Sequence, residues 1–132
     1  MVHSGKKILV VDDDPGIRES LRDLFSLDNF ECAVAASAEE GLALIREEMP
    51  QLVVADVQLP DMTGYQLCQT LKRDPASQSV PVVMISGRFT EPEDKIQGLE
   101  LGADEFLSKP FDPTYFVARV KSLLRVPAPS YI

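Results

Sequence analysis

The chain has 132 residues, 45% of them hydrophobic and 26% charged, and its formal net charge is −8. A chain of this size forms one globular domain that buries roughly two thirds of its unfolded surface, and a second domain does not fit. The negative charge repels phosphate backbones and anionic membranes, which argues against nucleic-acid or membrane binding by this chain itself.

Five short apolar runs alternate with segments of helical periodicity. Runs of this kind are typical of strands buried on both faces of a parallel sheet. In chain order they are ILVV (8–11), CAVAA (32–36), LVVA (52–55), VPVVMI (80–85) and FL (106–107).

Helical spacing, with apolar residues at i, i+4, i+7 and i+8, separates these runs. It is clearest in two sets: Ile17, Leu21, Leu24 and Phe25, then Phe116, Val120, Leu123 and Leu124. Three further helices are predicted near 38–48, 65–73 and 92–101. The alternation of five strands with five helices predicts an α/β fold with helices on both faces of a parallel sheet.

Capping patterns mark four of the helix starts. Two combine an N-cap acceptor with proline at the first helical position, and two match capping boxes. The four are Asp14 with Pro15, Asp112 with Pro113, Ser37 with Glu40, and Thr90 with Glu93. Because Asp14 is assigned to a helix cap, we exclude it from any metal site.

Polar side chains follow several predicted strands. Asp12 and Asp13 follow the first strand, Asp56 the third, Ser86 the fourth and Lys109 the fifth. The carboxyl ends of parallel strands open on one edge of the sheet, where ligands bind. If the first and third strands are neighbours, three carboxylates converge there.

Converging carboxylates require a cation, since like charges ~4 Å apart repel by about 4 kcal/mol at an effective dielectric of 20. Oxygen ligands without histidine or thiolate favour a hard ion such as Mg²⁺. Beside Mg²⁺ and Lys109, Asp56 is equipped to act as the nucleophile of a phosphoryl transfer. Nucleotide binding is disfavoured, because DDDPG after the first strand is acidic and no glycine-rich phosphate loop occurs.

The motifs VVDDDP, D-x-x-LPDMTG, MISG and GADEFLSKPF resemble, in order and spacing, the receiver domain of two-component response regulators. The resemblance covers about Lys7 to Leu124. It implies a flavodoxin-like, doubly wound parallel sheet of five strands in the order 2-1-3-4-5, with five helices. It also implies a signalling phosphoacceptor rather than an enzyme with turnover.

The resemblance implies a role for each site residue. Asp56 is phosphorylated by a partner sensor histidine kinase or phosphotransfer protein. Asp12, Asp13, Asp56 and the backbone carbonyl of Gln58 bind Mg²⁺.

A second set of residues is implied to respond to the phosphoryl group. Ser86 and Lys109 contact it, Phe106 is an aromatic switch, and the Lys109–Pro110 peptide bond is cis. Serine at 86, glycine at 87 and phenylalanine at 106 replace the commoner threonine, alanine and tyrosine. None of these differences, Gly87 included, removes a required group.

The surface made by the fourth helix, fifth strand and fifth helix is the implied output face, which contacts a downstream effector domain or protein. Lys95, Asp104 and Arg119 match charges that many DNA-binding regulators use to dimerise there. Tyr115 stands where those regulators often carry glutamate. We therefore expect a monomer, or a weak dimer that forms after phosphorylation.

Two alternative functions compete with this interpretation. A haloacid-dehalogenase-like phosphatase also has an apolar strand ending in D-x-D, a later serine or threonine, a lysine and Mg²⁺. Against it, the chain is short for that fold with a cap, and no acidic pair follows Lys109 at a strand end. A pure interaction module with the receiver fold is disfavoured by the intact acidic site.

The two cysteines, Cys32 and Cys68, lack metal-ligand spacing, and we expect reduced core residues, with a disulfide as the lesser alternative. The first apolar run meets aspartates too early for a signal peptide, and no run has transmembrane length. The protein is therefore expected in the cytoplasm.

We expect a receiver domain over residues 7–125. Residues 1–6 would form a tail that contains the sole histidine, His3, and residues 126–132 a second tail or the start of a linker. With no other histidine in the chain, we expect the phosphoryl group to come from elsewhere, either from a phosphohistidine donor or from a small phosphodonor such as acetyl phosphate.

Overall fold

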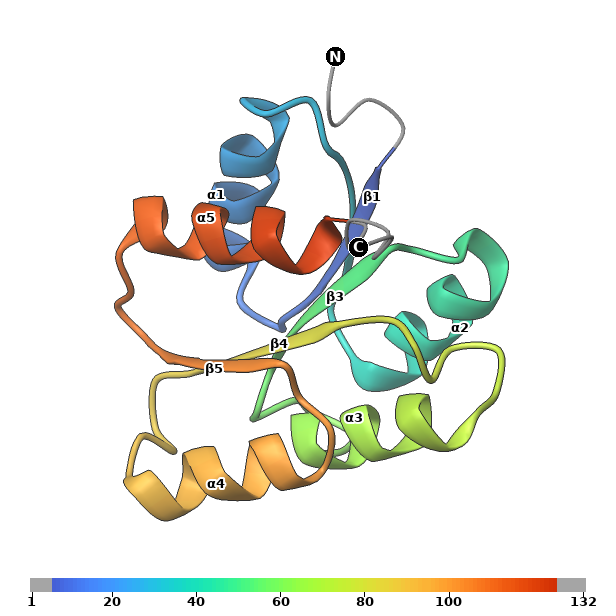
Figure 1. Cartoon of the computed structure of the whole chain (residues 1–132), viewed down its shortest axis with the longest axis vertical. Coiled ribbons are helices and arrows are strands. Elements are labelled where there is room, and N and C mark those ends of the chain that lie inside the picture. Colours follow the sequence, from blue (N-terminus) through green and yellow to red (C-terminus); the bar gives the residue numbers. More distant parts are fainter. Residues whose placement is uncertain (1–5, 126–132) are drawn as a thin grey trace, which may run out of the picture.

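The computed structural model describes residues 6–125, so most of the two predicted tails, with His3, lies outside the described residues. Five parallel strands form one sheet in the order β2-β1-β3-β4-β5 (Figure 1). The elements are β1 (Lys7–Val11), α1 (Pro15–Ser26), β2 (Glu31–Ala35), α2 (Ala38–Glu48), β3 (Leu52–Asp56), α3 (Gly64–Arg73), β4 (Val82–Ser86), α4 (Pro92–Glu100), β5 (Glu105–Ser108) and α5 (Pro113–Leu124). The predicted flavodoxin-like fold is confirmed.

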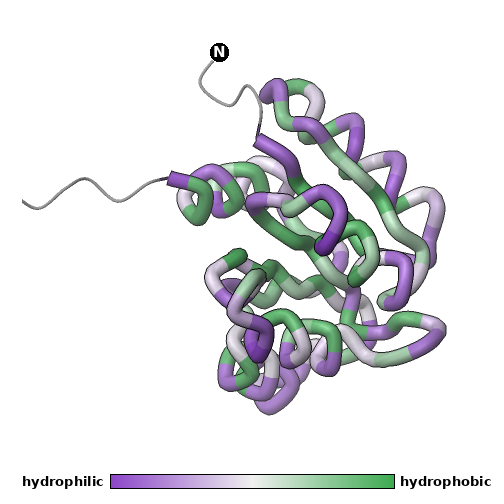
Figure 2. The backbone as a smooth tube through the Cα atoms, turned by 90° about the vertical axis from the view of Figure 1, so that its right-hand side faces the viewer, coloured by the Kyte–Doolittle hydropathy of each residue, from purple (hydrophilic) through white to green (hydrophobic). Residues whose placement is uncertain are grey.

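The sheet separates two hydrophobic cores. Successive residues of a strand point to opposite faces, so Ile8 and Val10 pack on the side of α1 and α5, whereas Leu9 and Val11 face the other core. Figure 1 shows α1 and α5 on one side of the sheet and α2, α3 and α4 on the other. Along the tube of Figure 2, green hydrophobic stretches mark the interior, and purple residues recur on the outer turns.

Burial follows strand position. Strands β3 and β4 are buried throughout, and so is β1 apart from its first residue. The outer strands β2 and β5 are only partly buried, because each has one edge without a neighbouring strand. The prediction of strands buried on both faces was therefore right for the three inner strands and wrong for the two outer ones.

Two of the predicted helix caps are formed by aspartates before proline. The Asp14 carboxylate accepts a hydrogen bond from the Gly16 N–H at 2.8 Å, and Asp112 accepts one from Thr114 at 2.9 Å. These bonds satisfy N–H groups that have no partner within the helix. Asp14 is thus the N-cap of α1, as predicted.

The other two caps differ from the predicted pattern. Ser37 does cap α2, accepting from the Glu40 N–H at 3.2 Å, but the Glu40 carboxylate accepts from Ala36, one residue before the cap. For α4 the N-cap is Glu91 rather than Thr90, because Pro92 takes the first helical position. The predicted Thr90 cap with Glu93 was therefore wrong.

The two cysteines lie on opposite faces of the sheet. Cys32 packs in the core beneath α1 and α5, and Cys68 in the core beneath α2, α3 and α4. Both are free thiols, and the sheet between them prevents a bond within one chain. Within residues 6–125, no helix combines the length and apolar character needed to cross a membrane.

Candidate functional site

Three carboxylates converge at the carboxyl edge of the sheet. Val11 of β1 lies opposite Ala55 of β3, so the residues that follow, Asp12 and Asp56, are neighbours. Oxygen atoms of Asp12, Asp13 and Asp56 lie within 4.8 Å of one another. Asp12 is fully buried, Asp56 is 7% exposed and Asp13 is exposed. The convergence expected from the strand order is confirmed, and this acidic group could hold a metal ion.

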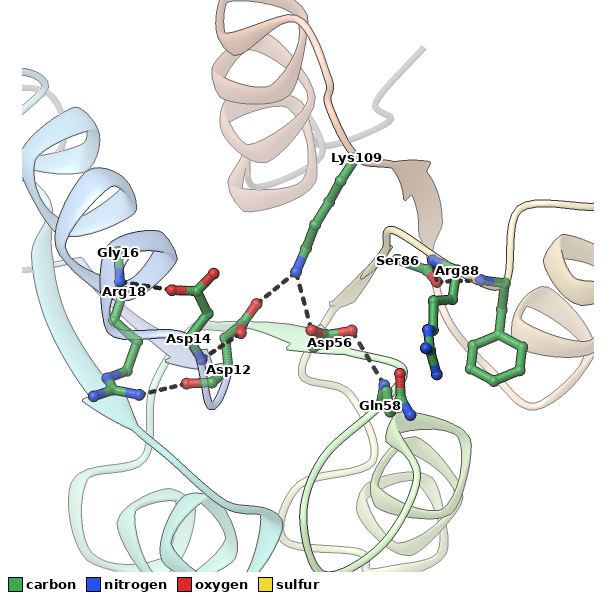
Figure 3. A network of polar contacts seen from close by, with 10 residues as sticks. Asp12, Asp14, Gly16, Arg18, Asp56, Gln58, Ser86, Arg88 and Lys109 are labelled. Atoms are coloured by element: carbon green, nitrogen blue, oxygen red, sulfur yellow. Dashed lines mark hydrogen bonds and ion pairs between the residues drawn. The ribbon is translucent and has the colours of Figure 1, made fainter.

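Lys109 is the counter-ion of this pocket. Its Nζ lies 3.0 Å from Oδ2 of Asp12 and 3.0 Å from Oδ2 of Asp56, so one ammonium group bridges two strands (Figure 3). Its backbone N–H donates to the Ser86 carbonyl at 2.7 Å, which fixes the start of the lysine side chain. The Lys109–Pro110 peptide bond is cis, in agreement with the resemblance.

Burial and charge act in opposite directions on the ionisable groups. Burial raises the pKa of Asp12 above its usual range, although hydrogen bonds from the Asp14 N–H and from Lys109 oppose this effect. Burial also lowers the pKa of Lys109, but hydrogen bonds to Asp56 and Asp12 together outweigh it, and the net shift is upward. The pocket therefore favours added positive charge.

The donor set suits a hard divalent cation. In the described part of the pocket, the three carboxylates are opposed by a single ammonium group, and the ligand atoms are all oxygens. Mg²⁺ characteristically binds through one or two carboxylates, other oxygens and water. The residues present therefore fit Mg²⁺.

Asp56 is held in a defined orientation. Its Oδ1 accepts a hydrogen bond from the Gln58 N–H at 3.1 Å, and its Oδ2 faces Lys109. Gln58 itself is exposed at the rim of the pocket. Both carboxylate oxygens thus have a partner. Metal binding by the Gln58 carbonyl stays a prediction.

The Ser86 hydroxyl is engaged by its own loop. Its Oγ accepts hydrogen bonds from the N–H groups of Arg88, at 3.2 Å, and Phe89, at 2.8 Å (Figure 3). The next residue, Gly87, lies against Lys109: an added Cβ would be 3.8 Å from its Cβ and Cδ, an ordinary contact. The phosphoryl-binding roles of Ser86 and Gly87 stay predictions.

The Phe106 ring is already buried. It is 5% exposed and lies beneath α4, where a Cβ on Gly98 would be 2.8 Å from its Cδ2. Gly98 therefore provides the space that the ring occupies. A switch role for Phe106 would require a second, outward position of this ring, and that role stays a prediction.

Two residues of the segment LPDMTG have structural roles that the sequence did not indicate. Gly64 starts α3 so close to β3 that an added Cβ would collide with the Asp56 carbonyl oxygen and lie 2.9 Å from Val57 Cα. The Asp61 carboxylate accepts hydrogen bonds from the start of α2. A glycine after a turn signals close backbone approach, but nothing in the sequence pairs Asp61 with a helix 22 residues earlier.

A doubly wound sheet with three carboxylates and a lysine at its carboxyl edge defines a phosphoacceptor domain of the receiver class. Residues 8–121 match the family described as the response regulator receiver domain, and the chain belongs to this family. This membership also removes the support for a haloacid-dehalogenase-like phosphatase.

The chain is similar to full-length transcriptional regulators. It is 39% identical over 125 residues to the phosphate regulon transcriptional regulatory protein PhoB of Pseudomonas aeruginosa, covering 95% of this chain and 54% of that protein. It is 43% identical over 120 residues to the probable transcriptional regulator ycf27 of Cyanophora paradoxa, covering 91% and 48%. The chain thus spans about half the length of these curated relatives.

Solved structures agree with the fold. A CheY-like response regulator receiver domain protein from Methanospirillum hungatei superposes with a TM-score of 0.83 at 33% identity, over 90% of this chain and 93% of that one. The receiver domain of a signal transduction histidine kinase from Syntrophus aciditrophicus gives 0.85 at 30% identity, over 97% of each chain.

Proposed function

We propose that residues 7–125 form the phosphoacceptor domain of a two-component response regulator, with Asp56 as the phosphorylated residue. The observation that carries the proposal is the position of the Asp56 carboxylate, which contacts Lys109 and lies beside the acidic pair Asp12 and Asp13. The phosphoryl donor is the phosphohistidine of a sensor histidine kinase or phosphotransfer protein.

In the proposed reaction, an oxygen of Asp56 attacks the phosphorus atom while the bond between phosphorus and the donor imidazole breaks. An acyl phosphate forms, and the imidazole leaves with its bonding electron pair. Mg²⁺ would be held by Asp12, Asp13, Asp56 and the Gln58 carbonyl. It would supply positive charge that stabilises the phosphoryl oxygens during the transfer. Lys109 neutralises the phosphoryl oxygens, and the Gln58 N–H orients Asp56.

Ser86 responds after the transfer. Phosphorylation adds charge and strong acceptor oxygens at Asp56, and the Ser86 hydroxyl is a donor at the end of the neighbouring strand. When it turns to the phosphoryl group, the N–H groups of Arg88 and Phe89 lose their present acceptor. The loop before α4 then rearranges, and Phe106 and Gly87 respond to its new position.

The test is intact-mass spectrometry with acetyl phosphate and Mg²⁺. We expect one phosphoryl group per chain, none on Asp56→Asn, and none when Mg²⁺ is chelated. Asp13→Ala should lose Mg²⁺ binding, because it removes a ligand. Acid-stable modification of Asp56→Asn, or repeated turnover of a phosphoester, would contradict the proposal.

The output face lies over α4, β5 and α5, where Ile96, Leu99 and Tyr115 are large hydrophobic residues exposed to solvent. A downstream effector domain or protein is the proposed partner there. The chain makes no nucleic-acid contact of its own in this proposal, because its net charge is −8. It acts in the cytoplasm, where histidine kinases have their phosphohistidine.

Internal contacts on this face support a monomer or a weak dimer that forms after phosphorylation. Arg119 Nε donates to Glu105 Oε2 at 3.0 Å, and the Tyr115 hydroxyl donates to the same oxygen at 2.9 Å. The Asp104 carboxylate accepts from the Val82 N–H and pairs with Lys72 at 3.7 Å. Light scattering that detects a tight unphosphorylated dimer at micromolar concentration would contradict this state.

A further inference from the structure

The loop between β3 and α3, residues 57–63, is tied at both its base and its tip. At the base, Gly64 N–H donates to the Val57 carbonyl at 2.6 Å, and Gln58 bridges to Thr63. At the tip, Asp61 Oδ1 accepts from the Ala38 N–H at 2.9 Å, and Oδ2 accepts from Glu39 at 2.8 Å. The loop thus reaches across to the first turn of α2.

The two Asp61 bonds supplement the cap of α2, because Ser37 accepts from the Glu40 N–H whereas Asp61 accepts from those of Ala38 and Glu39. Ser37 already caps this helix, and its first turn carries two glutamates that oppose the positive end of the helix dipole. Asp61 adds two further hydrogen bonds to this turn, one of them from the N–H of the fully buried Ala38. The two Asp61 bonds also fix the tip of loop 57–63, because they are charge-assisted hydrogen bonds. The same bonds hold the pKa of Asp61 below its usual range, so the carboxylate is ionised at neutral pH.

The start of α2 is in turn connected to the acidic pair. The Asp12 N–H donates to the Ala35 carbonyl at 3.0 Å, and Ala36 N–H donates to Glu40 of α2 at 2.7 Å. The turn between β2 and α2 therefore contacts the loop that carries Asp12 and, through Asp61, the loop that follows Asp56. Three loops of the site are joined through this turn.

We propose that Asp61 is a positioning residue for the metal site. By anchoring the tip of loop 57–63 to α2, it holds Gln58, whose N–H orients Asp56 and whose carbonyl is the proposed backbone ligand. The inference rests on the proposed function, because it assumes that this pocket binds Mg²⁺. Asp61 itself is not a ligand.

The test compares Mg²⁺ affinity by titration calorimetry in wild type, Asp61→Ala and Asp61→Asn. Removing a group that orients a metal ligand typically weakens affinity 10- to 100-fold, and we expect about tenfold for Asp61→Ala. Asp61→Asn keeps one acceptor oxygen, so its Mg²⁺ affinity should lie between those of wild type and Asp61→Ala. The matched control is Asp74→Ala, which removes an exposed aspartate that accepts from the Ala76 N–H at 2.9 Å, away from the site.

Two further measurements separate positioning from loss of stability. Without Mg²⁺, the temperature of thermal unfolding should fall in both Asp61→Ala and Asp74→Ala, and further in the former because Asp61 accepts two hydrogen bonds and Asp74 one. Only Asp61→Ala should lose Mg²⁺ affinity in the folded state. Amide NMR shifts of Ala38, Glu39 and Gln58 should change together in Asp61→Ala.

Each outcome has one meaning. Wild-type Mg²⁺ affinity in Asp61→Ala, or equal weakening in Asp74→Ala, would overturn the positioning role and leave the proposed function standing. Absence of Mg²⁺ binding by the wild type would overturn the proposed function, and the positioning role with it.

Discussion

Replacing Lys109 by methionine keeps an unbranched side chain, one atom shorter, and removes the positive charge that bridges Asp12 and Asp56. At an effective dielectric of 20, each 3.0 Å contact is an attraction of about 5.5 kcal/mol before desolvation is subtracted. Breaking a buried ion pair by removing one partner costs about 3–5 kcal/mol. Because the Lys109 side chain is 20% exposed, we expect the lower end, about 3 kcal/mol of unfolding free energy at pH 7 without Mg²⁺.

The assay is urea unfolding followed by far-UV circular dichroism, since the chain has no tryptophan. The matched control is Lys121→Met, which breaks the 2.7 Å surface pair with Asp28 and should cost no more than about 1 kcal/mol. Mg²⁺ should restore stability to Lys109→Met, because it returns positive charge to the pocket.

The pH dependence of this difference has a definite sign. Lys109 opposes the upward pKa shift of Asp12, so its removal raises that pKa further. As pH falls, folded Lys109→Met then takes up a proton before its unfolded chain does, and it gains stability relative to wild type. The difference in unfolding free energy between wild type and Lys109→Met should therefore become smaller at acid pH. If Lys109→Met and Lys121→Met lose the same unfolding free energy at pH 7, this account of the pocket is refuted.

Three further predictions concern packing and reactivity. Gly98→Ala should lower the unfolding free energy by up to about 2 kcal/mol, because crowding of Phe106 costs about 1–3 kcal/mol and the higher helix propensity of alanine offsets about 1 kcal/mol. A variant that urea unfolding shows to be more stable than wild type would contradict this crowding. Tyr65→Phe removes a 3.1 Å hydrogen bond to the Asp94 carbonyl and should cost about 1 kcal/mol, with faster amide exchange in α4 and unchanged exchange in α1. Burial raises the pKa of Cys68 to about 11, so this thiol should react with a disulfide reagent at pH 8 only after urea unfolding; rapid labelling of the folded protein would show that it is accessible.

Much of the site was predictable because its residues follow the ends of successive strands. An apolar run that ends in Asp12 and another that ends in Asp56 meet at one edge once their strands pair. Proline after an acidic residue also located two helix starts correctly. The same pattern, Glu91 before Pro92, marks the start of α4, and giving it priority over the Thr90 pattern would have placed that cap correctly.

Other features depend on contacts that the sequence does not encode locally. The Asp61 bonds join residues 22 and 23 positions apart, through a loop whose path is set by the packing of α2 beside α3. The orientation of Ser86 is set by two N–H groups of its own loop, which donate to its Oγ. Partial exposure of β2 and β5 follows from strand order, which became known only with the resemblance.

The resting contacts of Lys109 and Ser86 have a consequence for the proposed phosphorylation cycle. Lys109 already pairs with Asp12 and Asp56, so a phosphoryl group must compete with these carboxylates for it, whereas the Ser86 oxygen accepts two hydrogen bonds and its O–H is still able to donate. For Lys109 the exchange is favourable, because an Asp56 carboxylate of charge −1 is replaced by a phosphoryl group of about −1.5 to −2. For Ser86, the two bonds from Arg88 and Phe89 are lost only if Oγ itself moves toward Asp56 to make the new bond. In the proposed cycle, that movement transfers the cost of switching to the loop before α4, whose two N–H groups must then find water or other acceptors.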